Sequence, residues 1–139
     1  MTVEEPTSVV VIDASHDFRW IVRRVLQRKG GFDVVGDADD AVAGLEEVRL
    51  LQPDVVLLNV DDPRTEPGDV VREMRLSCPH ATVIATLSLS RGAVHDAVLA
   101  AGGAGVVRKD ITLQHTFDQL WSVLATCAAT QPALDLHPR

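Results

Sequence analysis

The chain has 139 residues and a net charge of −7 at neutral pH, with 46% hydrophobic and 24% charged residues. This length fits one domain with a buried core. The acidic balance argues against direct binding of nucleic acid, which needs clustered Lys and Arg. The longest apolar runs, Val9–Ile12 and Val55–Leu58, are too short to span a bilayer, and residues 1–6 do not resemble a signal peptide. We therefore expect a cytoplasmic protein with no membrane partner.

Hydrophobic periodicity predicts five strands that alternate with five helices. Ser8–Asp13 is a β-branched run typical of a strand buried on both faces, and the apolar residues of His16–Lys29 recur at helical spacing. The remaining elements follow in chain order: a strand at Phe32–Gly36, a helix at Ala41–Leu51, a strand at Asp54–Asn59, a helix at about Asp69–Leu76, a strand at Thr82–Leu87, a helix at Ala93–Ala101, a strand at Ala104–Arg108 and a helix at about Leu113–Ala125.

This regular alternation with short connections predicts an α/β domain, a parallel sheet covered by helices on both faces. In such open sheets the functional residues lie at the carboxyl ends of the strands. We divide the chain into an N-terminal extension at 1–7, a domain at 8–126 and a loose tail at 127–139, which shows no periodicity. The side chains that end the strands are Asp13, Asn59, Leu87 and Lys109.

Three stretches at these strand ends, Val9–Asp13, Gln52–Asn59 and Ala101–Asp110, resemble the receiver domain of two-component response regulators. The resemblance is closest to receivers whose output is a helix-turn-helix of the LuxR type, the NarL/FixJ subfamily. It covers roughly Ser8 to Ala125. It implies a flavodoxin-like (CheY-like), doubly wound, five-stranded parallel sheet with strand order 2-1-3-4-5 and helices on both faces.

The same resemblance implies a degenerate phosphoacceptor pocket. Asp13 matches the first acid of the family's acidic pair, but Ala14 stands where the second acid, a magnesium ligand, is usual. Asn59 stands at the aspartate that accepts phosphate, and an amide is a weak nucleophile and a poor ligand for a hard cation. Because Asp13 and the retained Lys109 balance in charge, we expect no magnesium or other cofactor and an ion pair between these two residues. Asn59 could donate to Asp13 and accept from Lys109.

Two more family positions are changed. The Thr or Ser that usually follows the fourth strand falls on Leu87, although Thr86 and Ser88 flank it and a shift of one residue would select either. The aromatic residue that usually reports activation on the fifth strand is Val106. The resemblance therefore implies an atypical receiver.

The two tryptophans suggest an interaction surface. Trp20 projects from its helix opposite the apolar face, beside Arg23 and Arg24, and Trp121 lies at the edge of the apolar face of the last helix. The first and fifth helices are neighbours in this fold, and this face is a dimer interface in some receivers of the subfamily, so the analogy favours a homodimer. The alternative is that both rings lie flat over neighbouring side chains.

The sequence therefore predicts a non-enzymatic, phosphorylation-independent receiver that acts in signal transduction or transcriptional regulation, through a homodimer or a partner regulatory protein. The residues after Ala125 are too few for a helix-turn-helix, so DNA would be reached only through an output domain absent from this chain. Two alternatives stay open. A small molecule could bind the strand-end pocket beside Ala14, or Asp61 or Asp62, just past the third strand, could serve as a substitute phosphoacceptor.

Overall fold

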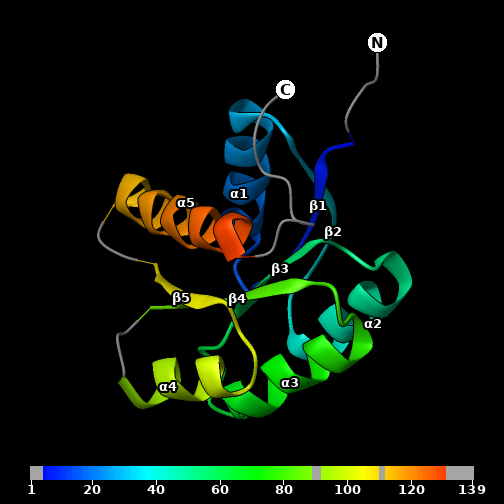
Figure 1. Cartoon of the computed structure of the whole chain (residues 1–139), viewed down its shortest axis with the longest axis vertical. Helices are drawn as coiled ribbons and strands as arrows, with labels where there is room; N and C mark the ends of the chain where they lie inside the picture. The colour runs from blue at the N-terminus through cyan, green and yellow to red at the C-terminus, as the bar shows by residue number, and fades with distance from the viewer. Residues whose placement is uncertain (1–4, 89–91, 110–111, 131–139) are drawn as a thin grey trace.

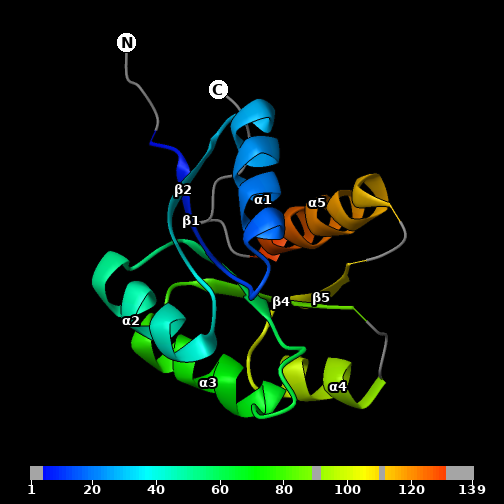
Figure 2. The ribbon, with the colours of Figure 1, turned by 180° about the vertical axis from the view of Figure 1, so that it is seen from behind.

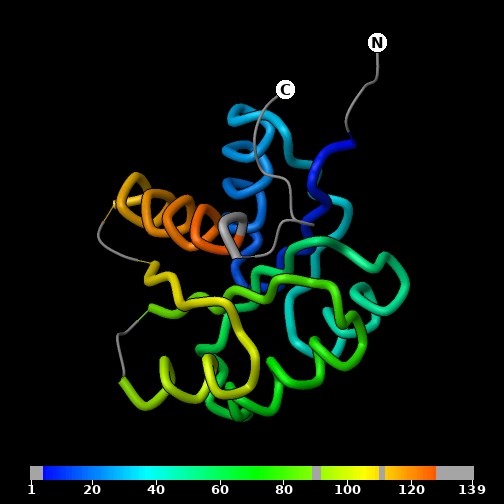
Figure 3. The backbone as a smooth tube through the Cα atoms, in the orientation of Figure 1, coloured from blue at the N-terminus to red at the C-terminus, as the bar shows by residue number. Residues whose placement is uncertain are grey.

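The computed structural model describes residues 5–88, 92–109 and 112–130, and every structural statement below refers to these residues. Strands and helices alternate along them, as Figure 3 traces. In chain order the elements are β1 (Thr7–Ile12), α1 (His16–Lys29), β2 (Phe32–Ala38), α2 (Ala41–Leu51), β3 (Val55–Asn59), α3 (Pro67–Ser77), β4 (Thr82–Leu87), α4 (Gly92–Ala100), β5 (Gly105–Arg108) and α5 (Leu113–Thr130).

The strands form one parallel sheet in the order β2-β1-β3-β4-β5. Helices α1 and α5 cover one face of this sheet, and α2, α3 and α4 cover the other (Figures 1 and 2). The predicted flavodoxin-like fold and its strand order are confirmed. Because all strands run the same way, their carboxyl ends meet at one edge, where the candidate site lies.

Two hydrophobic core clusters lie on the two faces of the sheet. Successive strand residues point to opposite faces, so Val9 and Val11 of β1 pack with α1 and α5, whereas Val10 and Ile12 pack with α2, α3 and α4. Within the described residues, every helix is too short or too polar to span a bilayer.

Local signals in the sequence place the helix that follows β1. The side chain of Ser15 accepts a hydrogen bond from the Phe18 amide at 3.1 Å and caps the first turn of α1. The helix ends at Gly30, whose φ of 80° lies in the region that glycine adopts without strain. The connection from β1 to α1 is therefore short, and it holds Asp13 and Ala14 at the edge of the sheet.

Both ends of the domain differ from the sequence-based boundaries. Thr7 already belongs to β1, although residues 1–7 were predicted as an extension. Helix α5 continues past Ala125 to Thr130, so residues 127–130 are helical where the loose tail was predicted to begin. Cys127 is buried in the core cluster of α1 and α5, which explains why the helix continues. Residues 131–139 of the predicted tail lie outside the described residues.

Candidate functional site

An ion pair joins the ends of β1 and β5. The Nζ atom of Lys109 lies 2.9 Å from Oδ2 of Asp13, whose side chain is only 3% exposed. The other carboxylate oxygen of Asp13 accepts a hydrogen bond from the Ser15 amide at 2.9 Å. The Lys109 ammonium also lies 4.4 Å from the centroid of the Phe18 ring, a cation–π geometry. The ion pair predicted from the sequence is therefore present.

The side-chain amide of Asn59 forms hydrogen bonds with β4 and with the loop that follows β3. Its Nδ2 donates to Oδ2 of Asp61 at 3.0 Å and, at 3.3 Å each, to the carbonyl and the hydroxyl oxygen of Thr86. Its Oδ1 accepts the Asp61 amide at 3.2 Å. The predicted hydrogen bonds to Asp13 and Lys109 are wrong. Thr86 is the direct register partner of Asn59, and Asp61 is two residues away, so both are closer partners for a short side chain.

The carboxylate of Asp61 ties the β3–α3 loop to the end of β4. Its Oδ1 accepts the Ser88 amide at 3.0 Å, and its Oδ2 accepts the Ser88 hydroxyl at 2.9 Å in addition to Asn59. Partial burial acts to raise the pKa of Asp61, but the hydrogen bonds from Ser88 and Asn59, with the nearby Lys109 charge, outweigh it and lower this pKa. Asp61 is therefore a fully ionised anion at neutral pH.

The Thr or Ser position of the family falls on Leu87, which has no hydroxyl, and both of its neighbours carry one. Leu87 is 1% exposed and packs in the core cluster of α2, α3 and α4, while its carbonyl accepts the Lys109 amide at 2.8 Å. The hydroxyls near Asn59 come from the flanking Thr86 and Ser88. Val106, at the position of the family's aromatic, is half-buried and packs against the same cluster as Leu87.

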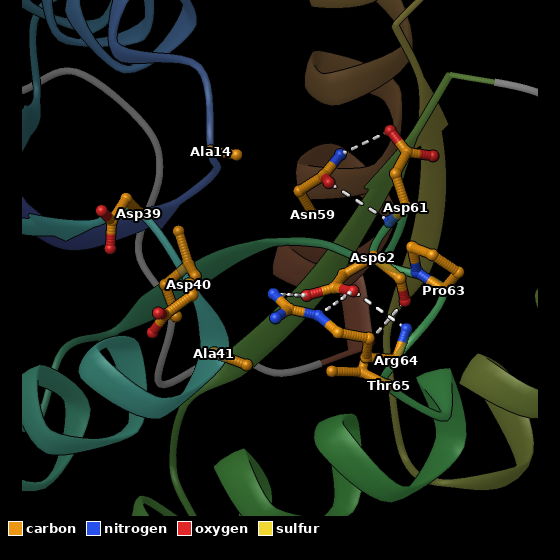
Figure 4. Close-up of a pocket in the computed structure, with 11 residues that line it drawn as sticks. Ala14, Asp39, Asp40, Ala41, Asn59, Asp61, Asp62, Pro63, Arg64 and Thr65 are labelled. Atoms are coloured by element: carbon orange, nitrogen blue, oxygen red, sulfur yellow. Dashed lines mark hydrogen bonds and ion pairs between the residues drawn. The ribbon is translucent and has the colours of Figure 1, made fainter.

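A cleft of about 320 Å³ opens where the loops after β1, β2 and β3 meet. In Figure 4, Ala14, Asp39 and Asp40 stand on one side of it, and the residues from Asn59 onward stand on the other. No group of three or more His, Cys, Asp or Glu side chains in the described ranges is placed to hold a metal ion.

Asp62 does not share the contacts of Asp61 on the wall of this cleft. Its carboxylate lies 2.9 Å from the Arg64 guanidinium and also accepts the Arg64 amide, which lowers the pKa of Asp62 and raises that of Arg64. The two consecutive acids therefore have separate partners: Asp61 binds Ser88 and Asn59, whereas Asp62 binds within its own loop.

Trp20 is the exposed member of the two tryptophans. Its side chain is 55% exposed on α1, with the Arg24 guanidinium 5.4 Å from the ring centroid. Arg23 is engaged elsewhere, because it donates to the Val34 carbonyl at 2.9 Å and lies 3.9 Å from the Asp37 carboxylate. Trp20 and Arg24 are thus the more accessible part of the predicted interface.

Trp121 packs mainly inside the fold. Its ring is half-buried, with centroids 6.0 Å from Phe32 and 6.1 Å from Phe117, and the Lys29 ammonium lies 5.0 Å from it. This ring packs against the core cluster of α1 and α5, so the contribution of Trp121 to any interface is limited to its outer edge.

The fold and the strand-end residues together define a doubly wound signalling domain of the CheY-like class. Residues 9–120 match the family model described as "Response regulator receiver domain". The chain belongs to this family, whose members act in two-component signalling.

Curated relatives are longer than this chain. Protein-glutamate methylesterase/protein-glutamine glutaminase 2 of Xanthomonas oryzae pv. oryzae is 38% identical over 109 residues, which cover 77% of this chain and 29% of the relative. The methylesterase/glutaminase of Symbiobacterium thermophilum is 31% identical over an alignment of 147 residues, gaps included, that covers 98% of this chain and 41% of the relative. The chain therefore spans less than half the length of these relatives.

Solved structures of receivers superpose well. The signal receiver domain of NarL from Mycobacterium tuberculosis has 31% identity and a TM-score of 0.74, covering 86% of this chain and 96% of its own. The response regulator domain of Thermotoga maritima CheB has 22% identity and a TM-score of 0.71, covering 96% and 100%. At that identity the second likeness supports the fold alone.

Proposed function

We propose that this chain is an atypical receiver that regulates through protein–protein contact and takes no phosphate at Asn59. The observation that carries this proposal is the strand-end chemistry. Asn59 replaces the nucleophilic carboxylate, Ala14 removes one metal ligand, and Lys109 neutralises Asp13 at 2.9 Å. A neutral amide forms no acyl phosphate, and a neutralised acid has little need of a divalent cation.

Restoring the lost groups tests this proposal. The unmodified chain and the Asn59→Asp/Ala14→Asp variant are exposed to acetyl phosphate, or to beryllofluoride with Mg²⁺, and followed by intact mass and thermal unfolding. We expect a phosphorylated product and a raised Tm for the double variant only. The matched control is Ala14→Asp alone, which keeps the amide and should gain no phosphate. An equal response from the unmodified chain would contradict the proposal.

The same experiment examines the residual phosphoswitch. A phosphate mapped to Asp61 or Asp62 of the unmodified chain would favour that alternative over ours. The contacts argue against it, because both oxygens of Asp61 accept hydrogen bonds and Asp62 is paired with Arg64. No catalytic activity is proposed for this chain, since it matches only a minor part of the methylesterases that it resembles.

For the partner we propose a second copy of the chain, joined through the α1 and α5 face in the cytoplasm. The exposed Trp20 supports this, and the likeness to the NarL receiver favours a LuxR-type regulator whose DNA binding resides in a separate output domain. We expect the unmodified chain to be a dimer by light scattering and Trp20→Ala to be a monomer. Leu76→Ala is the control, because it removes an exposed apolar side chain, 75% exposed, on the other face. A dimer that survives Trp20→Ala would exclude this surface.

A small-molecule sensor is the second candidate function, favoured by the cleft beside Ala14. Its volume of about 320 Å³ is at the small end of ligand sites. A metabolite panel screened by thermal unfolding should then yield a compound that stabilises the unmodified chain and fails to stabilise Ala14→Leu, which narrows the cleft. A panel without any such compound would leave the contact-based receiver as the function.

A further inference from the structure

Three hydrogen-bond donors surround the Asp61 carboxylate between the ends of β3 and β4. The Ser88 amide, the Ser88 hydroxyl and the Asn59 Nδ2 each donate to the Asp61 carboxylate at 2.9 to 3.0 Å. Lys109 adds a positive charge near enough to lower the pKa of Asp61. A backbone amide, a hydroxyl and a carboxamide around one carboxylate form the kind of donor set that binds small anions, and a nearby positive charge favours such binding.

We propose that these groups form an anion site that the chain fills with its own Asp61 carboxylate. The donors that form it come from two strand ends, Asn59 from β3 and Ser88 from just past β4. Lys109, just past β5, binds Asp13 and contributes only its charge. Asp61 reaches it because the chain turns back after Asn59, whose Oδ1 accepts the Asp61 amide at 3.2 Å.

Two consequences follow from an internal occupant. A free phosphate or carboxylate must displace a tethered carboxylate, whose effective concentration at the site is far higher than that of a free ion. The end of β4 is also tied to the β3–α3 loop in the absence of any ligand. The site is therefore closed to external anions and holds one arrangement of these loops, which deepens the proposed phosphorylation-independent function and concerns the same edge of the sheet.

Chemical rescue tests this inference. In Asp61→Ala the donors lose their carboxylate, and we expect a Tm lower by about 5 °C for lost hydrogen bonds of this kind in a domain of this size. Sodium formate at about 0.1 M should restore about half of this loss, relative to sodium chloride at equal ionic strength, because a ligand that binds only the folded state stabilises it. Asp62→Ala is the matched control, with a smaller loss of Tm and no response to formate.

The Ser88 hydroxyl provides a second variant. Ser88→Ala removes one donor from the site, so Asp61→Ala/Ser88→Ala should regain less Tm from formate than Asp61→Ala does. A formate response that is equal in Asp61→Ala, Asp62→Ala and the unmodified chain would overturn the anion site.

A measurement on the unmodified chain covers the case in which Asp61→Ala does not fold. The amide proton of Ser88 should move in NMR spectra as Asp61 is protonated, with a midpoint below the usual carboxyl pKa of 3.8. A Ser88 resonance insensitive to that titration would contradict the inference while leaving the proposed function intact. Phosphorylation of the unmodified chain at Asp61 would instead overturn both.

Discussion

Two carboxylates at the carboxyl edge of the sheet, those of Asp13 and Asp61, are stabilised in different ways. At the ends of β1 and β5, Asp13 is almost fully buried and is neutralised by Lys109. At the ends of β3 and β4, the carboxylate of Asp61 is only partly buried and is held chiefly by neutral donors from Asn59 and Ser88. Asp13 is therefore part of a buried ion pair, whereas Asp61 is a hydrogen-bonded anion.

This difference determines how much stability is lost when each carboxylate loses a partner. A buried charge that loses its partner keeps the full cost of desolvation, whereas a partly exposed carboxylate that loses a donor regains water. Substitution of Asp13 or Lys109 should therefore reduce the free energy of unfolding more than substitution of Asp61. The surroundings of Asp61 should be the more sensitive to pH, because the hydrogen bonds from Asn59 and Ser88 favour its ionised form.

The largest expected effect follows from removing the Lys109 charge. Lys109→Met keeps the length of the side chain but leaves Asp13 buried and unpaired, so we expect a loss of about 3 kcal/mol in the free energy of unfolding. Urea denaturation measures it. The control is Asp13→Asn/Lys109→Met, which removes both charges and should recover most of the loss. A cost below about 1 kcal/mol for Lys109→Met would show that the ion pair is hydrated in solution.

A smaller effect is expected from neutralising Asp61. Asp61→Asn keeps one acceptor for the Ser88 amide but places a second NH₂ group against Asn59, so we expect a loss of about 1 kcal/mol in the free energy of unfolding. Asp62→Asn, which disturbs only an exposed pair with Arg64, should cost less than Asp61→Asn. Equal costs for the two variants would erase the distinction between these neighbouring acids.

Acid should reduce the contribution of Asp61 in a defined pH range. The pKa of Asp61 in the folded chain lies below its usual value of 3.8, because hydrogen bonds and Lys109 outweigh partial burial. The stabilisation is therefore complete above that value and is lost as the pH falls through the folded-state pKa. The difference in unfolding free energy between the unmodified chain and Asp61→Asn should be constant from pH 7 to about pH 5 and shrink below about pH 4.

The smallest effect is expected at Thr86. Its hydroxyl lies 3.3 Å from the Asn59 Nδ2, a long hydrogen bond, and that same Nδ2 keeps Asp61 as its closer partner at 3.0 Å. Thr86→Val preserves the shape of the side chain, so the unfolding free energy should change by less than about 0.5 kcal/mol. A larger loss would mean that Thr86, rather than Asp61, is the main partner of Asn59.

The fold could be predicted almost entirely because it depends on periodicity and on turn signals. The bounds of α1, His16–Lys29, are the same in the sequence-based prediction and in the structure, since Ser15 and Gly30 mark its ends. The end of α5 was missed because the helix continues through Cys127, whose burial depends on the packing of α1 and α5.

The candidate site was predicted in part. Asp13 and Lys109 follow β1 and β5, which β3 and β4 separate in the sheet, and their pairing was predicted from the family resemblance and from their opposite charges. The bonds of Asn59 were predicted wrongly, and Ser88 was considered only as a substitute for the position of Leu87. The signal that could have found Ser88 is its place just past β4, which lies next to β3 in the sheet and therefore beside the loop that holds Asp61.

The amino-acid sequence by itself determined the parallel sheet, the edge at which the site lies and the absence of a carboxylate at Asn59, because these depend on residue types and their spacing. Only the tertiary structure decided that Asn59 binds Asp61 and Thr86, that the Asp61 carboxylate accepts hydrogen bonds from Ser88, and that Trp121 packs against the core. Periodicity tells which face a side chain occupies, whereas a hydrogen bond depends on ångström-scale distances between loops that are far apart in the chain.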